Sequence, residues 1–253
     1  MQASWFDLTG RCALVTGAGK GLGRTIALAL ARAGADVAVA SRTEADLVKL
    51  ADEIRAIGRR AVVAVTDIAD EQSIVAMVQT TLQGLGQIDI LVNNAGIEGL
   101  GAVVEMDAAA WDRVMAVNLR APMLCCKHVG THMIARRSGK VINVASVMAT
   151  AVSRYMSPYA SSKAGLVQLT RTLALEWMRY NIQVNALCPG YFLTPMNEAF
   201  FATDTGKRLI AGLPGQRLGQ PPELEGAAVF LASDATSFIT GTTLYVDGGH
   251  SLR

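Results

Sequence analysis

The sequence has little of several features that would narrow its function at once. Its 253 residues include four cysteines and three histidines, and charged residues make up 17% of the chain with a net charge of +2. No stretch reaches the roughly 18 uninterrupted apolar residues of a membrane-spanning helix. The mixed charge contains no basic block that would favour nucleic acid or a membrane surface. We therefore expect neither kind of partner.

The scarce cysteines and histidines also fail to form recognisable sites. The cysteines show neither CxxC spacing nor a disulfide framework, which fits a reducing compartment. Met1–Cys12 lacks the basic-then-apolar layout of a signal peptide, so we expect a cytoplasmic protein. His128 and His132 stand four residues apart, but no carboxylate completes an HExxH pattern and no third ligand lies nearby. We expect no metal site.

Hydrophobic residues make up 51% of the chain, and they alternate between short β-rich runs and longer helical stretches. The runs expected as strands are Ala13–Thr16, Val37–Ala40, Ala61–Val65, Ile90–Asn93, Val141–Ala145, Gln183–Leu187 and Thr243–Val246. The stretches expected as helices are Gly21–Gly34, Glu44–Ile57, Glu71–Leu85, Trp111–Ala135, Tyr159–Tyr180 and Pro222–Ala232. This alternation predicts one α/β domain over residues 1–253, a doubly wound parallel sheet with helices on both faces.

A glycine-rich turn directly follows the first expected strand and opens the first helix. Its spacing is GxxxGxG, with Gly17, Gly21 and Gly23 at the fixed positions. Such a turn lets the backbone approach a pyrophosphate closely and directs helix N-terminal N–H groups at the anion. An ordinary tight turn between strand and helix is the alternative. The placement favours dinucleotide binding.

The residues after the second expected strand bear on which dinucleotide is bound. An acidic residue there would bond the ribose hydroxyls of NAD, whereas an arginine would pair with the 2′-phosphate of NADP. The chain has Ser41 and Arg42 at that point, and Lys20 adds a second cation on the same side. Arg42 could also be a solvated loop residue. Two cations with no acid favour NADP(H) over NAD(H).

A tyrosine and a lysine four residues apart open the helix that follows the fifth expected strand. Tyr159 and Lys163 at this spacing lie on one helical face. A nearby cation favours the phenolate, and it would lower a pKa that is ordinarily near 10. Ser146, at the end of the preceding strand, could hold a substrate oxygen beside the phenol. These residues suit general acid/base chemistry.

In their order along the chain, these motifs resemble the short-chain dehydrogenase/reductase family over nearly the whole length. The matching elements are the Thr16–Gly23 turn, Asp67, Asn93–Gly96, Asn118, Ser146, Tyr159 with Lys163, and Pro189–Gly190 with Thr194. The resemblance implies a Rossmann fold and a nicotinamide-dependent oxidoreductase. Phe192 departs from the pattern, since an aliphatic residue is commoner there.

The resemblance implies a role for each matched residue. Tyr159 would donate the proton to a carbonyl or accept it from an alcohol, and Lys163 would bind the nicotinamide ribose and lower the Tyr159 pKa. Ser146 would orient the substrate oxygen, and Asn118 would hold a water in a proton relay that ends at the lysine. The residues expected to bind the cofactor are Gly17, Gly19, Lys20, Gly21, Leu22, Gly23, Ser41, Arg42, Asp67, Ile68, Asn94, Ala95, Gly96, Tyr159, Lys163, Pro189, Gly190, Phe192 and Thr194.

The substrate is less well defined by the sequence. Residues 191–215 interrupt the strand–helix pattern and are expected to form an irregular lid. The residues expected to contact substrate are Ser146, Met148, Met156, Tyr159 and Tyr191, a partly apolar set. Among family members the chain resembles both the 3-oxoacyl-[acyl-carrier-protein] reductases and the gluconate 5-dehydrogenase-like enzymes; we expect a 3-oxoacyl or general ketone reductase, with a sugar or sugar-acid dehydrogenase as the alternative. A non-catalytic dinucleotide-binding sensor or scaffold is a third possibility.

The last segment of the chain bears on assembly. Thr240–Gly249 resembles the final strand and tail of tetrameric family members, where this region packs between subunits. The resemblance therefore implies a homotetramer.

Overall fold

A computed structural model describes residues 5–195 and 197–252. The strands in these residues form one parallel sheet in the order β3-β2-β1-β4-β5-β6-β7. Their bounds are β1 (Cys12–Thr16), β2 (Asp36–Ser41), β3 (Ala61–Val65), β4 (Ile90–Asn93), β5 (Gly139–Val144), β6 (Ile182–Pro189) and β7 (Thr243–Val246). The predicted doubly wound α/β fold is confirmed.

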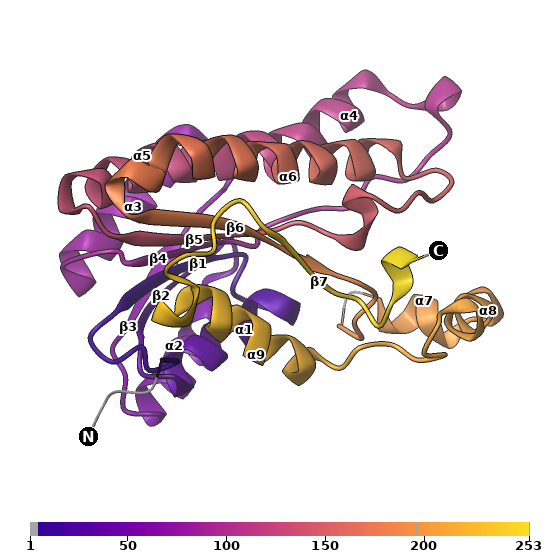
Figure 1. Ribbon diagram of the computed structural model, residues 1–253. Helices are drawn as coiled ribbons and strands as arrows, with labels where there is room; N and C mark the ends of the chain where they lie inside the picture. The colour runs from indigo at the N-terminus through magenta and orange to yellow at the C-terminus, as the bar shows by residue number, and fades with distance from the viewer. Residues whose placement is uncertain (1–4, 196, 253) are drawn as a thin grey trace.

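Helices cover both faces of the sheet (Figure 1). One layer contains α1 (Gly21–Arg32), α2 (Glu44–Ala56) and α9 (Glu225–Ala232), and the opposite layer contains α3 (Glu71–Leu85), α5 (Ala121–Arg136) and α6 (Ser157–Trp177). Side chains of a strand alternate between the two layers. In β1, Ala13 and Val15 belong to the core under α1, whereas Cys12 and Leu14 belong to the core under α3 and α5. Burial on both faces explains why the strands are unbroken apolar runs.

The helix expected over Trp111–Ala135 is in fact two helices. Helix α4 (Ala108–Met115) leads into a π-helical turn at Ala116–Arg120, and α5 follows. Asn118 lies inside this wider turn, and its side chain bonds both the N–H and the carbonyl of Ile97. A helix changes its regular hydrogen bonding where a side chain disturbs it, and π-turns are frequent at functional sites. The spacing of the apolar residues alone does not show that the helix is interrupted.

The segment 191–215 is more ordered than expected, because it contains two short helices. Helix α7 (Glu198–Ala202) and helix α8 (Asp204–Gly212) are separated by Thr203. The Thr203 hydroxyl accepts a hydrogen bond from the Gly206 N–H and so caps α8. Phe201 is buried and packs edge-on against Tyr191. The prediction of an irregular segment was therefore wrong.

Short 3₁₀ turns connect several elements. They are Val103–Glu105, Val147–Ala149, Met178–Tyr180, Pro221–Leu224, Asp234–Thr236 and His250–Leu252. Among the described helices, none combines the length and the apolar character required to cross a membrane. The strand order reverses between β1 and β4, and crevices at such a switch point are where open α/β sheets bind ligands.

Candidate active site

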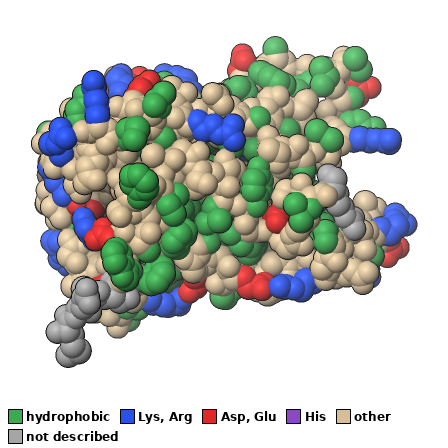
Figure 2. All heavy atoms as spheres, viewed as in Figure 1, with side chains coloured by type: hydrophobic (Ala, Val, Ile, Leu, Met, Phe, Trp, Pro, Cys, Tyr) green, Lys and Arg blue, Asp and Glu red, His purple; other side chains and the backbone are tan. Residues whose placement is uncertain are grey.

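Two connected hollows lie along the carboxyl edge of the sheet. The first is a cavity of about 580 Å³ between the ends of β4, β5 and β6, and the second, of about 370 Å³, lies beside the ends of β2 and β3. Gly17, Lys20 and the segment Ala95–Ile97 line both. Figure 2 shows the surface hollowed on this side, between the far end of α4 and the α7–α8 segment. Together they form one groove, long enough for an extended ligand.

The glycine turn stands at the middle of this groove and fits a pyrophosphate. Gly17 and Gly21 have φ values of +64° and +56°, which glycine adopts without strain. A Cβ on Gly23 would stand 2.3 Å from both the Gly17 carbonyl oxygen and Asn94 Nδ2. Asn94 Nδ2 itself donates to the carbonyls of Thr16 and Gly17, at 3.0 and 3.2 Å. The turn is therefore clamped to the end of β4, and only glycine fits.

Helix α1 begins directly after this turn. Its first residues have no side-chain cap among the described contacts. The N-terminal N–H groups of a helix need partners, and an anion can supply them. This observation supports the predicted phosphate site.

The second hollow brings together the residues expected to contact the adenosine end. Ser41, Arg42, Asp67 and Ile68 all line it. Neither Arg42 nor Arg113 of α4, which also lines it, forms a salt bridge within the described chain. These guanidinium groups are available for an anionic ligand. Arg113 was not expected here, since it follows Ser41 by many residues.

One premise about charge in this hollow was wrong. The expectation was two cations without an acid, but Asp46 of α2 also lines the hollow. Its carboxylate forms a 3.2 Å salt bridge with Lys20. Lys20 therefore has an acidic partner inside the protein, whereas Arg42 forms no salt bridge within the described residues.

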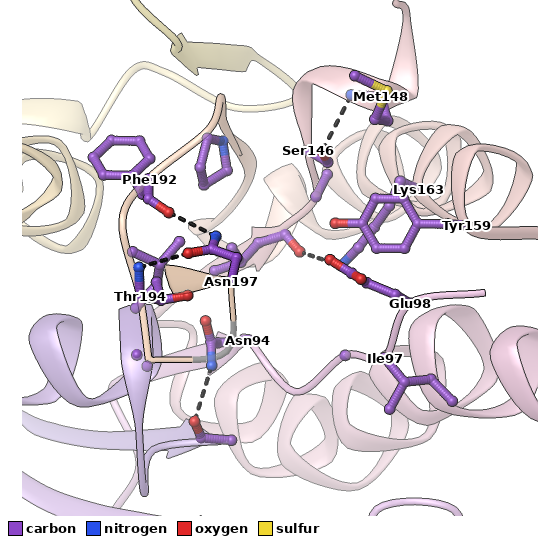
Figure 3. Close-up of a pocket in the computed structure, with 18 of the residues that line it drawn as sticks. Asn94, Ile97, Glu98, Ser146, Met148, Tyr159, Lys163, Phe192, Thr194 and Asn197 are labelled. Atoms are coloured by element: carbon purple, nitrogen blue, oxygen red, sulfur yellow. Dashed lines mark hydrogen bonds between the residues drawn. The ribbon is translucent and has the colours of Figure 1, made fainter. Parts of the chain in front are cut away.

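Three of the four predicted catalytic side chains, Ser146, Tyr159 and Lys163, meet in the first cavity (Figure 3). Ser146 lies two residues after β5, while Tyr159 and Lys163 come from the first turns of α6. Lys163 Nζ is buried, donates to the Val144 carbonyl at 2.9 Å and lies 5.7 Å from the centre of the Tyr159 ring. The arrangement places an acidic hydroxyl, an alcohol and an amine on one wall.

The pKa of Tyr159 differs from the expectation. The pKa of the phenol is raised to about 12: burial raises it most, a hydrogen bond with Ser146 lowers it, and the charge of Glu98 raises it. Burial also lowers the Lys163 pKa to about 8. The pKa of Tyr159 is thus raised and not lowered, and Lys163 is not among the groups that shift it. The amine bonds the Val144 carbonyl instead of the phenol, and the low-dielectric interior disfavours both charged forms.

Asn118 lies on the other side of the lysine. Its Oδ1 accepts from the Ile97 N–H at 2.8 Å, and its Nδ2 donates to the Ile97 carbonyl and to Ser162 Oγ. A Cβ on Gly96 would stand 3.4 Å from both Asn118 Oδ1 and Lys163 Nζ. The two groups thus flank the same glycine. The relay water between them stays a prediction.

The loop after β6 forms the remaining wall. Pro189, Gly190, Phe192 and Thr194 line the cavity as predicted. Asn197 holds this loop in shape, because it accepts from the Thr194 N–H at 2.9 Å and donates to the Phe192 carbonyl at 2.8 Å. Figure 3 shows both bonds. Asn197 was missed because it lies in the segment expected to be irregular.

The residues expected to contact substrate also face this cavity. Met148, Met156 and Tyr191 line it with Ser146 and Tyr159, and the Tyr191 ring stacks on His250 at 5.3 Å. Sequence reasoning missed Glu98, whose carboxylate reaches the same cavity. Its position two residues after the Asn93–Gly96 motif is a signal that could have identified it.

Comparison with known proteins identifies the family. The family model described as enoyl-(acyl carrier protein) reductase matches residues 17–251. The chain belongs to the short-chain dehydrogenase/reductase family. Gluconate 5-dehydrogenase of Gluconobacter oxydans is 40% identical over 245 residues, 96% of each chain. The 5-keto-D-gluconate 5-reductase of Escherichia coli is 39% identical over 96% of each chain.

Solved structures of short-chain dehydrogenases/reductases agree with this assignment. Gluconate 5-dehydrogenase from Burkholderia cenocepacia, in complex with NADP and tartrate, superposes with a TM-score of 0.93 and is 40% identical, covering 98% of both chains. Levodione reductase superposes with a TM-score of 0.92 and is 35% identical, covering 96% of this chain and 98% of that one. The chain is thus an oxidoreductase acting on CH–OH groups, as expected. The relatives give no specific support to the 3-oxoacyl reductase interpretation, and they favour its gluconate dehydrogenase-like alternative.

Proposed function

We propose that this short-chain dehydrogenase/reductase interconverts a secondary alcohol and a ketone on a small substrate of the sugar or sugar-acid class, with NADP(H) as cofactor. The observation that carries the proposal is the continuity of the groove. Tyr159, Lys163 and Ser146 line one end of it, and Arg42 lines the other. The names of the relatives, gluconate 5-dehydrogenase and 5-keto-D-gluconate 5-reductase, support the substrate class.

The residues along the groove fit the parts of NADP(H). The Gly17–Gly23 turn and the start of α1 would hold the pyrophosphate, Arg42 the 2′-phosphate, Asp67 with Ile68 the adenine, and Pro189–Thr194 the carboxamide. When bound, the cofactor supplies or takes up the hydride. The protein contributes position, charge and the proton.

The proton chemistry follows from burial. With a pKa of about 12, the Tyr159 phenol keeps its proton at neutral pH and can donate it to a carbonyl oxygen. Ser146, bonded to the same phenol, would hold that oxygen beside it. Lys163 would contact the nicotinamide ribose and, in its charged form, stabilise the phenolate left after transfer. These three side chains suit the site to carbonyl reduction.

The proposal predicts a characteristic pH dependence. The pKa of Lys163 is lowered to about 8, so the free enzyme loses this positive charge as the pH rises through that value. The kcat/KM for reduction, which reports groups of the free enzyme, should fall above about pH 8. Because Tyr159 titrates near 12, it does not cause this fall. A rate that stays flat to about pH 10 would contradict the role of Lys163.

The reaction itself is tested by following NADPH oxidation. The panel would contain 5-keto-D-gluconate, simple ketoses, cyclic diketones and acetoacetyl thioesters, each with NADPH and with NADH. We expect turnover of a polyhydroxylated ketone with NADPH, and little with the cyclic diketones or the thioesters. Turnover of thioesters alone would reject the proposed substrate class.

Replacing Arg42 with alanine tests the cofactor preference. The substitution removes a bidentate phosphate contact, so the Kd for NADPH should rise by about ten- to a hundredfold, while that for NADH changes by less than about threefold. Arg59, which pairs with Asp36 away from the groove, provides the control: R59A should leave the ratio of the two constants unchanged. Equal losses for both cofactors in R42A would refute the phosphate contact. The homotetramer implied by the resemblance stays a prediction.

A further inference from the structure

A carboxylate stands beside the reacting groups without a salt-bridge or hydrogen-bond partner in the described part of the chain. Glu98 follows β4 and lines the cavity with Tyr159 and Tyr191, and Figure 3 shows its side chain reaching toward Tyr159. Its charge acts at both rims of the cavity, since it raises the pKa of both Tyr159 and Tyr191. Within the described chain Glu98 makes no salt bridge or hydrogen bond. Its oxygens are free to contact a substrate.

Within the described residues, the cavity lining holds no free cation to balance that charge. Among its described lining residues the other charged groups are Lys20 and Lys163. Lys20 is paired with Asp46 on the cofactor side of the groove. Lys163 is buried with its amine on the Val144 carbonyl. A substrate carboxylate entering this end would meet Glu98 without a free cation, and like charges at close range repel.

Hydroxyl groups would interact with Glu98 in the opposite way. An ionised carboxylate is a pure acceptor with two oxygens, and hydrogen bonds to a charged acceptor are stronger than neutral ones. A substrate carrying several hydroxyls next to the reacting carbon can supply these donors. We propose that Glu98 is a specificity-determining residue that selects neutral polyhydroxylated substrates over sugar acids of the same skeleton. This inference rests on the proposed function and narrows its substrate class.

The test compares D-glucitol with D-gluconate, which share the polyol chain and differ in CH₂OH against carboxylate. The wild-type enzyme with NADP⁺ should have the higher kcat/KM for glucitol. Glu98→Gln keeps the size and removes the charge, so it should raise kcat/KM for gluconate by about tenfold and change that for glucitol by less than about threefold. Glu105→Gln is the matched control, since Glu105 is exposed nearby and does not line the cavity. A glucitol-to-gluconate ratio that is the same in wild type and E98Q overturns the proposal.

A second measurement separates this proposal from the proposed function. If neither polyol reacts, the sugar assignment fails, and charge selection is then decided by binding to the NADP-loaded protein. The probes are 4-oxocyclohexanecarboxamide and 4-oxocyclohexanecarboxylate, which differ only in the ionised group. The amide should bind about tenfold more tightly to the wild type, and E98Q should lose this difference. Equal affinities in the wild type, a preference that persists in E98Q, or no binding of either compound would overturn the role of Glu98.

Discussion

Replacing Tyr159 with phenylalanine is expected to lower kcat/KM by about a hundred- to ten-thousandfold, the range that a positioned general acid contributes. The ring is partly buried and would keep its packing, so the substitution removes only the transferable proton and the hydrogen bond with Ser146. The Kd for NADPH should change by less than about threefold, because the substitution leaves the glycine turn and Arg42 intact. Steady-state rates and cofactor fluorescence titration measure the two effects separately.

The control for this substitution is another tyrosine. Tyr180 follows α6 at its far end, and its hydroxyl accepts from the Arg179 guanidinium at 2.6 Å. Y180F should retain the wild-type rate. A Y159F enzyme that keeps more than about a third of the wild-type kcat/KM would remove the assigned acid, whatever its affinity for the cofactor.

Gly23→Ala is expected to have the second large effect, a rise of at least about a hundredfold in the Kd for NADPH. The new Cβ would stand 2.3 Å from the backbone oxygen of Gly17, so the turn or the helix must move. Overpacking of this kind costs about 1–3 kcal/mol. Alanine favours helix over glycine by about 1 kcal/mol, which is not enough to compensate. Denaturant unfolding should therefore show lower stability in addition to the weaker binding.

Gly226→Ala provides the matched helical control. Gly226 lies in α9, and a Cβ there would meet nothing within 4 Å. Only the higher helix propensity of alanine over glycine then acts, so G226A should be as stable as the wild type or more stable by up to about 1 kcal/mol. If G23A bound NADPH as well as G226A does, the close approach of the turn would have no role in cofactor binding.

The fold was largely predictable because its signals are local. Runs such as Ala13–Thr16 and Val37–Ala40 are apolar on both faces, and each is followed by a helix whose apolar residues recur at helical spacing. A strand buried on two sides and a helix buried on one have different patterns, which a single sequence displays directly. The strand-to-helix position of Gly17–Gly23 likewise depends on neighbours in the chain.

The local patterns were less informative where a polar side chain or a cap determined where a helix is interrupted or ends. Asn118 lies in a π-turn inside a stretch whose apolar residues keep helical spacing. Its side chain bonds Ile97, some 21 residues earlier. Thr203 ends one short helix and begins another in a segment rich in glycine and proline. Such breaks depend on partners that the periodicity does not specify.

The sequence by itself determined the sheet, the order of the motifs and the identity of Tyr159, Lys163 and Ser146. Only the tertiary structure decided their electrostatics: it put Asp46 against Lys20, turned the Lys163 amine to the Val144 carbonyl and brought Glu98 to the phenol. Local sequence patterns depend on neighbours along the chain and on the spacing at which side chains become buried. A pKa or a charge balance instead depends on burial and on distances between groups far apart in the chain, and these exist only once the chain has folded.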